Sequence, residues 1–427
     1  MARTQAYLDQ VKTLSDRIVA AQKPIRVLDA IAWDDRIKQA FIDSRYRKPP
    51  PVDAEYYRQN RPLNFDPLEK KREFNEIERD LTRKLGQLNT LSLIMRRICR
   101  EYRNVVRMLE SRGTPDFAMI SQSLYGSAGD VFHAGDPTLA DLGAMMEETL
   151  ASLTRLDFLQ DEPKTVPAKA AVEWLNERIN TAFPGAGLRV MVSDGIAADA
   201  AAGTGYIKLR GDALFNERDL RIMEVHEGWV HLGTTLNGMS QPYCTFLGKG
   251  PPSATITQEG LATLMEILAM RSTPTRLQRL INRVRAVTLA EDGADFIEVF
   301  RFFLDKSADV DESWTLASRV FRGSLPDGLP FTKDLTYIKG FVLIYNFIRL
   351  AVSKGKPQRL PLLFVGKTMI DDMKTIADLV EEGVITPPQY LPPQFADLMG
   401  LSAWFSFSRF MAALNFDQLE ADYANII

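Results

Sequence analysis

The chain has 427 residues, of which 45% are hydrophobic and 25% charged, and its formal net charge is −3. The mean hydropathy is −0.14. This composition is ordinary for a globular protein and gives no general affinity for nucleic acid or an anionic membrane. Cys99 and Cys244 are its only cysteines, which excludes a disulfide framework. The N-terminal stretch MARTQAYLDQVKTLSDRIV lacks the apolar core of a signal peptide, so we expect a cytoplasmic location.

The first third of the chain predicts helices joined by a proline-rich connector. Apolar residues recur at three- and four-residue spacing in residues 7–33 and 74–109. Between them, residues 45–66 are rich in proline and aromatic side chains, which predicts an extended surface strap rather than a helix. Further helices are expected at 137–155 and 166–183. We therefore expect an N-terminal helical region, residues 1–160.

Two short strands are predicted after these helices. The runs GLRVMVSD and GTGYIKLRG are alternating or β-branched, with glycine at their edges, and the small-residue stretch GIAADAAA separates them. We expect the two strands to pair in a small sheet. The second strand could offer an edge to an extended peptide, or it could be an interior strand. Directly afterwards, residues 216–238 predict a helix with Asn216 as the N-cap and Asn237-Gly238 as the C-cap.

The remainder of the chain is predicted to be mostly helical. The most apolar run, GFVLIYNFIRLAV, is interrupted by Asn346 and Arg349 and is too short to span a bilayer. No phosphate-binding loop or G-x-G-x-x-G motif follows a strand. The fold class is mostly α with a small β-sheet (α+β), and residues 161–427 form a second region that we expect to join the first in one globule. Helices are expected at 257–270, 276–306, 311–322, 333–353, 367–383 and 401–414.

Two of the three histidines in the chain lie in the stretch EVHEGWVHLGTT. His226 and His231, with Glu227 beside the first, form the H-E-x-x-H pattern of zinc hydrolases with one residue added. Side chains five apart on a regular helix differ by roughly 140°, so these histidines could share a metal only across a π-bulge. Gly228, the weakest helix former of the segment, would permit one. A histidine–glutamate pair on a helix is otherwise an ordinary surface or core feature. The prediction of a metal site therefore depends on a third ligand.

A third ligand is available in the stretch SATITQEGLATLMEILAM. Thr257 is the expected N-cap of this helix, which places Glu259 in the first turn, where the helix dipole alone also favours glutamate. A carboxylate from a second helix is the usual third ligand of two-histidine, one-glutamate zinc hydrolases. We predict one zinc ion held by His226, His231 and Glu259, with a fourth position open to water. Glu227 would then act as the general base.

The motif pair HEGWVH and QEGLA resembles the bacterial flavohaemoglobin expression-modulating QEGLA-motif proteins, a family related to the animal microtubule-associated tyrosine carboxypeptidases. The resemblance extends from NFDPLEKKREF through LYG and GTGYIKLRG to FTKDLTYIKG. It implies a zincin-like metallopeptidase core with an active-site helix and a second, glutamate-bearing helix. It also implies that His226, His231 and Glu259 bind zinc, that Glu227 is the general base, and that a peptide or protein C-terminus is the substrate.

Two limits apply to this resemblance. Tubulin is not carried over as the substrate, since a bacterial-type chain need not meet it. The expression-modulating name of the family also suggests an alternative, a regulatory or binding protein that keeps the metallopeptidase fold without catalysis.

Several residues are candidates for supporting roles. A transition-state oxyanion needs a hydrogen-bond donor, and Tyr337 is preferred here over Arg322 and His133. Glu266, seven residues after Glu259 on the same helix face, is a candidate partner for a ligand histidine. A terminal carboxylate needs a cation. The possible cations are Arg210, Lys208, Lys333 and Arg322.

Cys244 lies between the ligands in sequence, in SQPYCTFLGKGPP. If its thiolate bound zinc, the site would be closed and therefore structural. We predict that it does not bind zinc, because we expect this loop to form a rim of the active site and a buried thiol is the commoner fate of such a cysteine.

Overall fold

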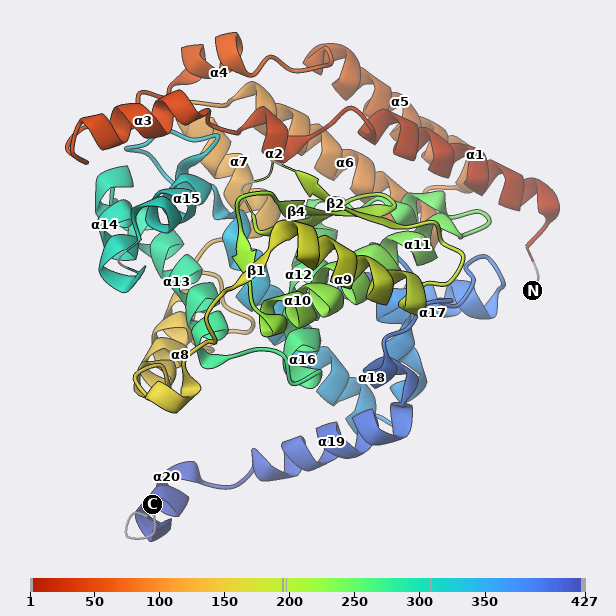
Figure 1. Ribbon diagram of the computed structural model, residues 1–427. Helices are drawn as coiled ribbons and strands as arrows, with labels where there is room; N and C mark the ends of the chain where they lie inside the picture. The colour runs from red at the N-terminus through yellow and green to blue at the C-terminus, as the bar shows by residue number, and fades with distance from the viewer. Residues whose placement is uncertain (1–2, 194–195, 197, 308, 424–427) are drawn as a thin grey trace.

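Helices surround two small sheets in the computed structural model, which describes residues 3–193, 196, 198–307 and 309–423 (Figure 1). The N-terminal elements are α1 (Gln5–Gln22), α2 (Val27–Ala30), α3 (Asp35–Asp43), α4 (Ala54–Asn60), α5 (Pro67–Leu85), α6 (Thr90–Glu110), α7 (Pro115–Tyr125), α8 (Leu139–Leu153) and the short η1 (Asp157–Leu159). The middle of the chain forms β1 (Val166–Pro167), α9 (Ala168–Ala182), β2 (Arg189–Ser193), β3 (Ala200–Ala202), β4 (Tyr206–Arg210), β5 (Leu214–Phe215), α10 (Glu217–Met223), η2 (Glu224–Leu232), α11 (Gly233–Met239) and η3 (Thr245–Gly248).

The C-terminal part is helical throughout, as its sequence predicts. Its elements are α12 (Pro252–Leu268), α13 (Pro274–Glu291), α14 (Phe296–Ser307), α15 (Val310–Phe321), η4 (Thr332–Leu335), α16 (Thr336–Ser353), η5 (Pro357–Phe364), η6 (Ile370–Asp372), α17 (Met373–Glu381), α18 (Pro393–Ala396), α19 (Leu398–Met411) and α20 (Phe416–Tyr423). The predicted fold class, mostly α with a small sheet, is therefore confirmed.

The predicted long helices divide at glycine and proline. The helix expected over 74–109 is interrupted at Gly86, whose φ of 97° is readily adopted only by glycine. The helix expected over 276–306 is divided around Gly293, with φ of 105°. The connector 45–66 was wrongly predicted as wholly extended. It contains α4, which buries Tyr57, and the hydroxyl of this tyrosine accepts a hydrogen bond from Trp33 Nε1 at 2.7 Å.

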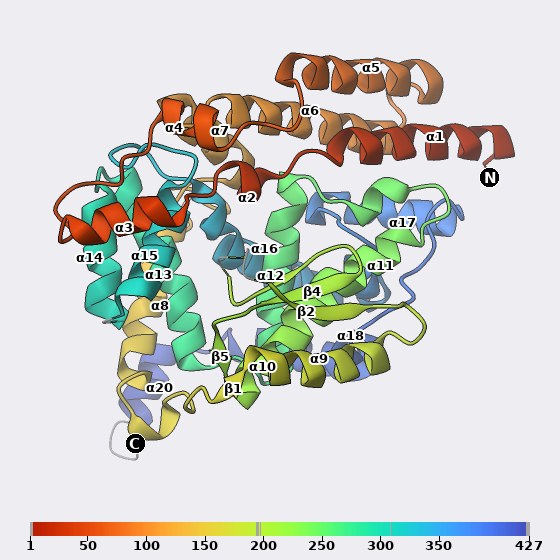
Figure 2. The same ribbon diagram turned by 45° about the horizontal axis from the view of Figure 1, so that its top comes forward.

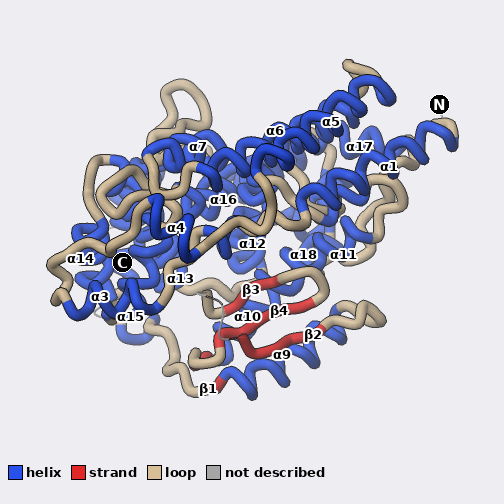
Figure 3. The backbone as a smooth tube through the Cα atoms, turned by 90° about the horizontal axis from the view of Figure 1, so that it is seen from above, coloured by secondary structure: helices blue, strands red, loops and turns tan. Residues whose placement is uncertain are grey.

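The three-stranded sheet has the strand order β2-β4-β3, with β2 parallel and β3 antiparallel to β4, and β1 and β5 form a separate antiparallel pair. The predicted pairing of the two strands is thus confirmed, and β4 is the interior strand, so it offers no edge to a peptide. The stretch predicted only to separate the strands supplies the edge strand β3, while Asp194, Gly195 and Ala197 lie outside the described residues. One face of the sheet packs against α9 and η2, as Figure 3 shows for α9.

Helices α12 and α16 cross at the centre of the molecule, with their backbones in contact (Figure 2). A Cβ atom on Gly260 would overlap the carbonyl carbon of Gly340, and one on Gly340 would overlap the carbonyl oxygen of Ile256. Both positions therefore require glycine. The apolar run GFVLIYNFIRLAV is part of a longer stretch, Thr332–Ser353, which is long and apolar enough to cross a membrane by length and composition. In this fold its small-residue face packs on α12.

The largest apolar core joins the N-terminal helices to these central helices. It includes Leu14 of α1, Phe74 of α5 and Val106 of α6 together with Leu264 of α12 and Ile348 of α16. A separate core lies between α9, the sheet and η2. The helix that carries the histidines therefore lies between the sheet on one side and α12 on the other.

Candidate metal centre

The two histidines lie on a π-helical segment, η2, inserted between α10 and α11. Its wider turn removes the angular misfit of a five-residue spacing. The imidazole rings of His226 and His231 lie with their centroids 4.8 Å apart at an interplanar angle of 82°. The predicted convergence of the two histidines through a π-turn is confirmed. Gly228 allows this segment to lie directly on α9, because a Cβ there would overlap Cδ1 of Ile179.

The helical run from α10 to α11 begins where the sequence predicted but ends later. Asn216 is the N-cap, and it forms a reciprocal capping box with Asp219. The predicted C-cap at Asn237-Gly238 is wrong, because α11 continues to Met239. The side chain of Asn237 is buried, donates to the backbone oxygen of Tyr390 and accepts from its N–H. It anchors the helix end to the C-terminal segment.

Glu259 reaches the histidines from α12. This helix begins at Pro252, so Thr257 is not its N-cap and Glu259 lies in the second turn, contrary to the prediction. Oε2 of Glu259 is 3.5 Å from Nε2 of His226 and 3.5 Å from Nε2 of His231. The three potential ligand atoms all lie within 4.8 Å of one another.

This arrangement fits a metal ion. Oε2 of Glu259 is buried and has no hydrogen-bond partner among the described residues, and a buried, unsatisfied carboxylate oxygen is costly. Zinc ligands at about 2.0–2.2 Å from a tetrahedral ion lie roughly 3.3–3.5 Å apart, close to the two separations between Glu259 and the histidines. Two imidazole nitrogens and one carboxylate are a donor set that suits zinc.

The charges around the site favour a bound cation. Burial would raise the pKa of Glu259, but Lys333, 3.5 Å away, and the two imidazoles outweigh burial and hold it well below its usual value. Burial would lower the pKa of His226, but Glu259 and Glu266 outweigh burial and raise it well above its usual value. A carboxylate and an imidazole that stabilise each other's charge in this way are suited to holding a divalent cation in place of the shared proton.

Glu266 holds His226 from behind. Its Oε1 accepts a hydrogen bond from Nδ1 of His226 at 2.7 Å, which leaves Nε2 free to bind a metal. The predicted contact of Glu266 with a histidine is therefore confirmed. Arg276 donates two hydrogen bonds to the same carboxylate, at 2.9 and 3.1 Å. Burial alone would raise the pKa of Glu266, but Arg276 and His226 outweigh it and lower that pKa to about 2.

Glu227 lies beside His226 but outside the three-residue cluster. Its side chain is partly buried, and its Oε2 accepts a hydrogen bond from the backbone N–H of Ala202 at 2.8 Å. The edge strand β3 thus orients this carboxylate. Sequence reasoning missed Ala202, because it belongs to the stretch that was predicted only to separate two strands.

The family model of the microtubule-associated tyrosine carboxypeptidases matches residues 39–413. The chain belongs to the microtubule-associated tyrosine carboxypeptidase family. The match covers His226, Glu227, His231, Glu259 and Tyr337, and it confirms the relationship predicted from the sequence. Membership in this family supports a carboxypeptidase-like function in general. A search of individual curated proteins found no match.

A carboxypeptidase needs a hydrogen-bond donor for the transition-state oxyanion near the three potential metal ligands. Tyr337 is such a residue, with its ring centroid 6.4 Å from that of His226. His133 is not brought to the site, since it is exposed and lies 3.1 Å from Asp136 in a surface loop. Arg322 interacts electrostatically with Asp334 and Tyr337.

The four cations proposed for a terminal carboxylate occupy different environments. Arg210 is paired with Asp199 at 3.0 Å and with Asp212 at 3.1 Å. Lys208 lies over the ring of Tyr206, 5.5 Å from its centroid. Arg210 and Lys208 therefore have partners on and around the sheet. Lys333 and Arg322 lie nearer the ligands and Tyr337.

Lys367 supports the site, although the sequence does not mark it. Its Nζ donates to the backbone oxygen of His231 at 2.9 Å, to Thr234 Oγ1 at 3.0 Å and to Gln258 Oε1 at 2.8 Å. It thereby ties η2 to α12. Burial lowers its pKa to about 7. His231 and Gln258 are 136 and 109 residues away in sequence, so no local pattern reveals these contacts.

Cys244 is buried in the main apolar core, and burial raises the pKa of its thiol to about 12. It lies outside the cluster of potential ligands. The expectation that its loop forms a rim of the site is wrong for the central part of the loop. Phe246 and Leu247 are buried, and the N–H of Phe246 donates to Ser15 Oγ of α1 at 2.8 Å.

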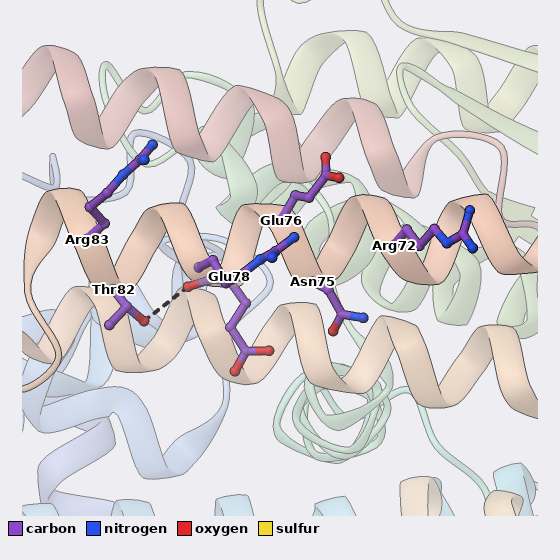
Figure 4. Close-up of a pocket in the computed structure, with 7 residues that line it drawn as sticks. Arg72, Asn75, Glu76, Glu78, Thr82 and Arg83 are labelled. Atoms are coloured by element: carbon purple, nitrogen blue, oxygen red, sulfur yellow. Dashed lines mark hydrogen bonds between the residues drawn. The ribbon is translucent and has the colours of Figure 1, made fainter.

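A surface hollow of about 820 Å³ lies elsewhere, along α5 (Figure 4). Its lining belongs wholly to that helix and is mostly charged, whereas the potential metal ligands lie on η2 and α12. The residues that line it are Arg72, Asn75, Glu76, Glu78, Arg79, Thr82 and Arg83.

Proposed function

We propose that the protein is a zinc-dependent carboxypeptidase that releases a residue from the C-terminus of a peptide or protein. The observation that carries this proposal is the buried Oε2 of Glu259, which lies 3.5 Å from both histidine Nε2 atoms and lacks a hydrogen-bond partner among the described residues. His226, His231 and Glu259 would hold the ion. A cytoplasmic location remains our expectation from the sequence.

The ion would supply a polarised water of lowered pKa at its open position. Glu227 would accept the proton of that water. Its Oε2 accepts a hydrogen bond from Ala202 N–H at 2.8 Å, which restrains the carboxylate, and Oε1 would receive the proton. Glu227 can then deliver this proton to the amine that leaves when the peptide bond breaks.

Tyr337 is our choice for the donor to the developing oxyanion. It stands beside the ligand His226 on α16, a helix that packs directly on α12. Tyr337 is only partly buried. A positioned hydroxyl donor stabilises negative charge better in such a site than in open water.

The family name specifies tyrosine as the released residue, and this preference is part of the proposal for the present chain. The ring of Tyr337, with Cζ of Arg283 5.1 Å from its centroid, is a surface against which an aromatic side chain could stack.

The test combines metal analysis with a peptide library whose members differ only in their C-terminal residue. We expect one zinc per chain and release of a single C-terminal amino acid, with tyrosine among the preferred residues. Glu227→Gln serves as the inactive control. Absence of bound zinc would overturn the metal site. Stoichiometric zinc without release from any peptide would instead favour the non-catalytic, regulatory alternative.

A further inference from the structure

Helix α19 has one apolar face that packs on the rest of the chain. Leu401, Phe405 and Ser408 lie at helical spacing on this inner face, and α19 contacts α16. Leu401 and Phe405 are buried. The ring centroid of Phe405 lies 5.4 Å from that of Tyr345 on α16, and the hydroxyl of Tyr345 is 2.6 Å from that of Ser408. The inner face therefore attaches α19 to the body of the molecule.

A second apolar face of this helix is open to solvent, and we call it the α19 stripe. Its members are six large side chains on α19 and in the turn that follows: Met399, Trp404, Phe407, Phe410, Met411 and Leu414. Their exposed fractions range from 43% for Met411 to 86% for Met399, so no other part of the described chain covers them. Figure 1 shows α19 along the lower edge of the molecule, with α20 at the far end of this arm.

The area of the α19 stripe is larger than a single chain usually exposes. At roughly 200 Å² for a large side chain, the exposed fractions amount to roughly 700 Å². The largest apolar patch of a typical monomer is about 300–600 Å². Each partner in a standard protein–protein interface buries about 800 Å². The stripe therefore has nearly the area that one half of a stable interface needs.

The spacing and charge of the stripe suit a second copy of the same helix. Trp404, Phe407 and Met411 are three and four residues apart, the interval at which one helix packs against another. Arg409 is the only charged residue of α19, and it lies roughly 160° around the helix from Phe407. Two such stripes can therefore meet across a two-fold axis without bringing like charges together.

A lipid surface fits the stripe less well. Helices that lie on a membrane usually carry several lysine and arginine side chains on their polar face, which bind anionic lipids. The polar side of α19 offers only Arg409. The next helix, α20, adds the exposed acidic residues Glu420 and Asp422, which repel anionic headgroups. The charges around the stripe therefore favour a protein partner.

We propose that the α19 stripe is a homodimer interface, in which α19 of one chain packs against α19 of a second copy. The inference uses neither the metal centre nor the proposed carboxypeptidase function. The inner face of each α19 connects the interface to α16 of its own chain, so the two bodies are joined through helices that belong to their cores.

The test is the mass of the protein in solution, measured by light scattering after gel filtration at micromolar concentration. We expect the parent to have twice the chain mass of 48.1 kDa. Phe407→Glu should give the mass of one chain, because it would bury an unpaired carboxylate at the centre of the interface. Arg409→Glu is the matched control, since it places the same side chain on the opposite side of the same helix, and it should remain a dimer.

Two outcomes of this measurement overturn the proposal. A parent protein with the mass of one chain shows that the stripe does not pair, and this result needs no variant. A dimer that persists in Phe407→Glu shows that another surface forms it. Circular dichroism verifies that both variants are folded.

Chemical cross-linking locates the interface independently. Cys99 and Cys244 are buried, so a cysteine introduced at the surface is the thiol that reacts. Ala403 is exposed and lies four residues before Phe407 on the same side of the helix. Ala403→Cys should give a covalent dimer with a flexible bismaleimide, whereas Arg409→Cys should not. Equal cross-linking of the two variants contradicts the proposal.

Sedimentation with lipid vesicles distinguishes the remaining occupant. Vesicles of phosphatidylcholine, with and without phosphatidylglycerol, are mixed with the parent and with Phe407→Glu. We expect neither protein to sediment with them. A parent that is monomeric and binds vesicles through Phe407 would assign the stripe to a membrane surface and overturn the proposal.

Discussion

Oε1 of Glu266 accepts a hydrogen bond from Nδ1 of His226 at 2.7 Å, although the two residues are 40 apart in the sequence. Glu266 is fully buried. The carboxylate is itself held by Arg276 on a third helix. The orientation of the imidazole is therefore set by α12 and α13, outside the helix that carries it.

This relationship predicts the effect of Glu266→Gln. The neutral amide keeps the size of the side chain but removes the charge that fixes the imidazole, and it leaves Arg276 without its partner. Zinc affinity should fall by about 10- to 100-fold, as measured by competition with a chromogenic chelator. Glu173→Gln, at an exposed position on α9, should leave the affinity unchanged. Equal affinities in the two variants would contradict a role for Glu266 in orienting His226.

The roles of the two other glutamates can be separated by metal content. Glu227→Gln should retain one zinc per chain and lose about 10²- to 10⁴-fold in kcat, because it removes a proton acceptor and no ligand. Glu259→Ala should lose the metal. Inductively coupled plasma mass spectrometry and peptide hydrolysis measure both quantities on the same samples. Full activity of Glu227→Gln on a confirmed substrate would show that the assigned mechanism is wrong.

Cys244→Ala should keep the zinc stoichiometry and near wild-type activity. The thiol is buried in the apolar core with a raised pKa, far from the thiolate form that binds zinc. Removing the sulfur leaves a small cavity, so we expect the free energy of unfolding to fall by about 1–2 kcal/mol. Denaturant titration measures that loss. Loss of zinc in this variant would instead identify the cysteine as a ligand.

Gly228→Ala should disturb the π-helical segment. The added methyl group would overlap Cδ1 of Ile179 on α9, so either the end of that side chain or one of the two elements must shift. We expect a loss of about 1–3 kcal/mol in stability, together with weaker zinc binding. Ile179→Val removes Cδ1, and the double variant should regain part of both quantities. A double variant no better than Gly228→Ala would show that this contact does not shape η2.

The sequence predicted those parts of the site that depend on local spacing. His226, His231 and Glu259 are separated by intervals that only a widened helix and a second helix can satisfy, and the structure brings them together. Glu266 followed from its helical offset relative to Glu259. The helix boundaries were less predictable, since α12 begins at Pro252 and the apparent cap at Thr257 lies inside it.

The residues that sequence reasoning missed act through distant contacts. Lys367 donates to His231 and Gln258 across more than a hundred residues, and Arg276 binds Glu266 from a separate helix. Ala202 contributes only its backbone N–H, which any amino acid except proline provides. Side-chain type carries no signal for such a role. The edge strand β3 was missed for a related reason, since three consecutive alanines have weak strand propensity.

The backbone contact between Gly260 and Gly340 fixes how α12 and α16 lie relative to each other. Glu259 immediately precedes one glycine, and Tyr337 lies three residues before the other. The two helices are in backbone contact and cannot shift along each other, so the distance from His226, His231 and Glu259 to Tyr337 is fixed. Substitutions between Glu259 and Tyr337 could change which terminal residue is accepted. They could not increase the distance between these two residues without separating the two helices. The contact between α12 and α16 would thus hold Tyr337 at a constant distance from Glu259.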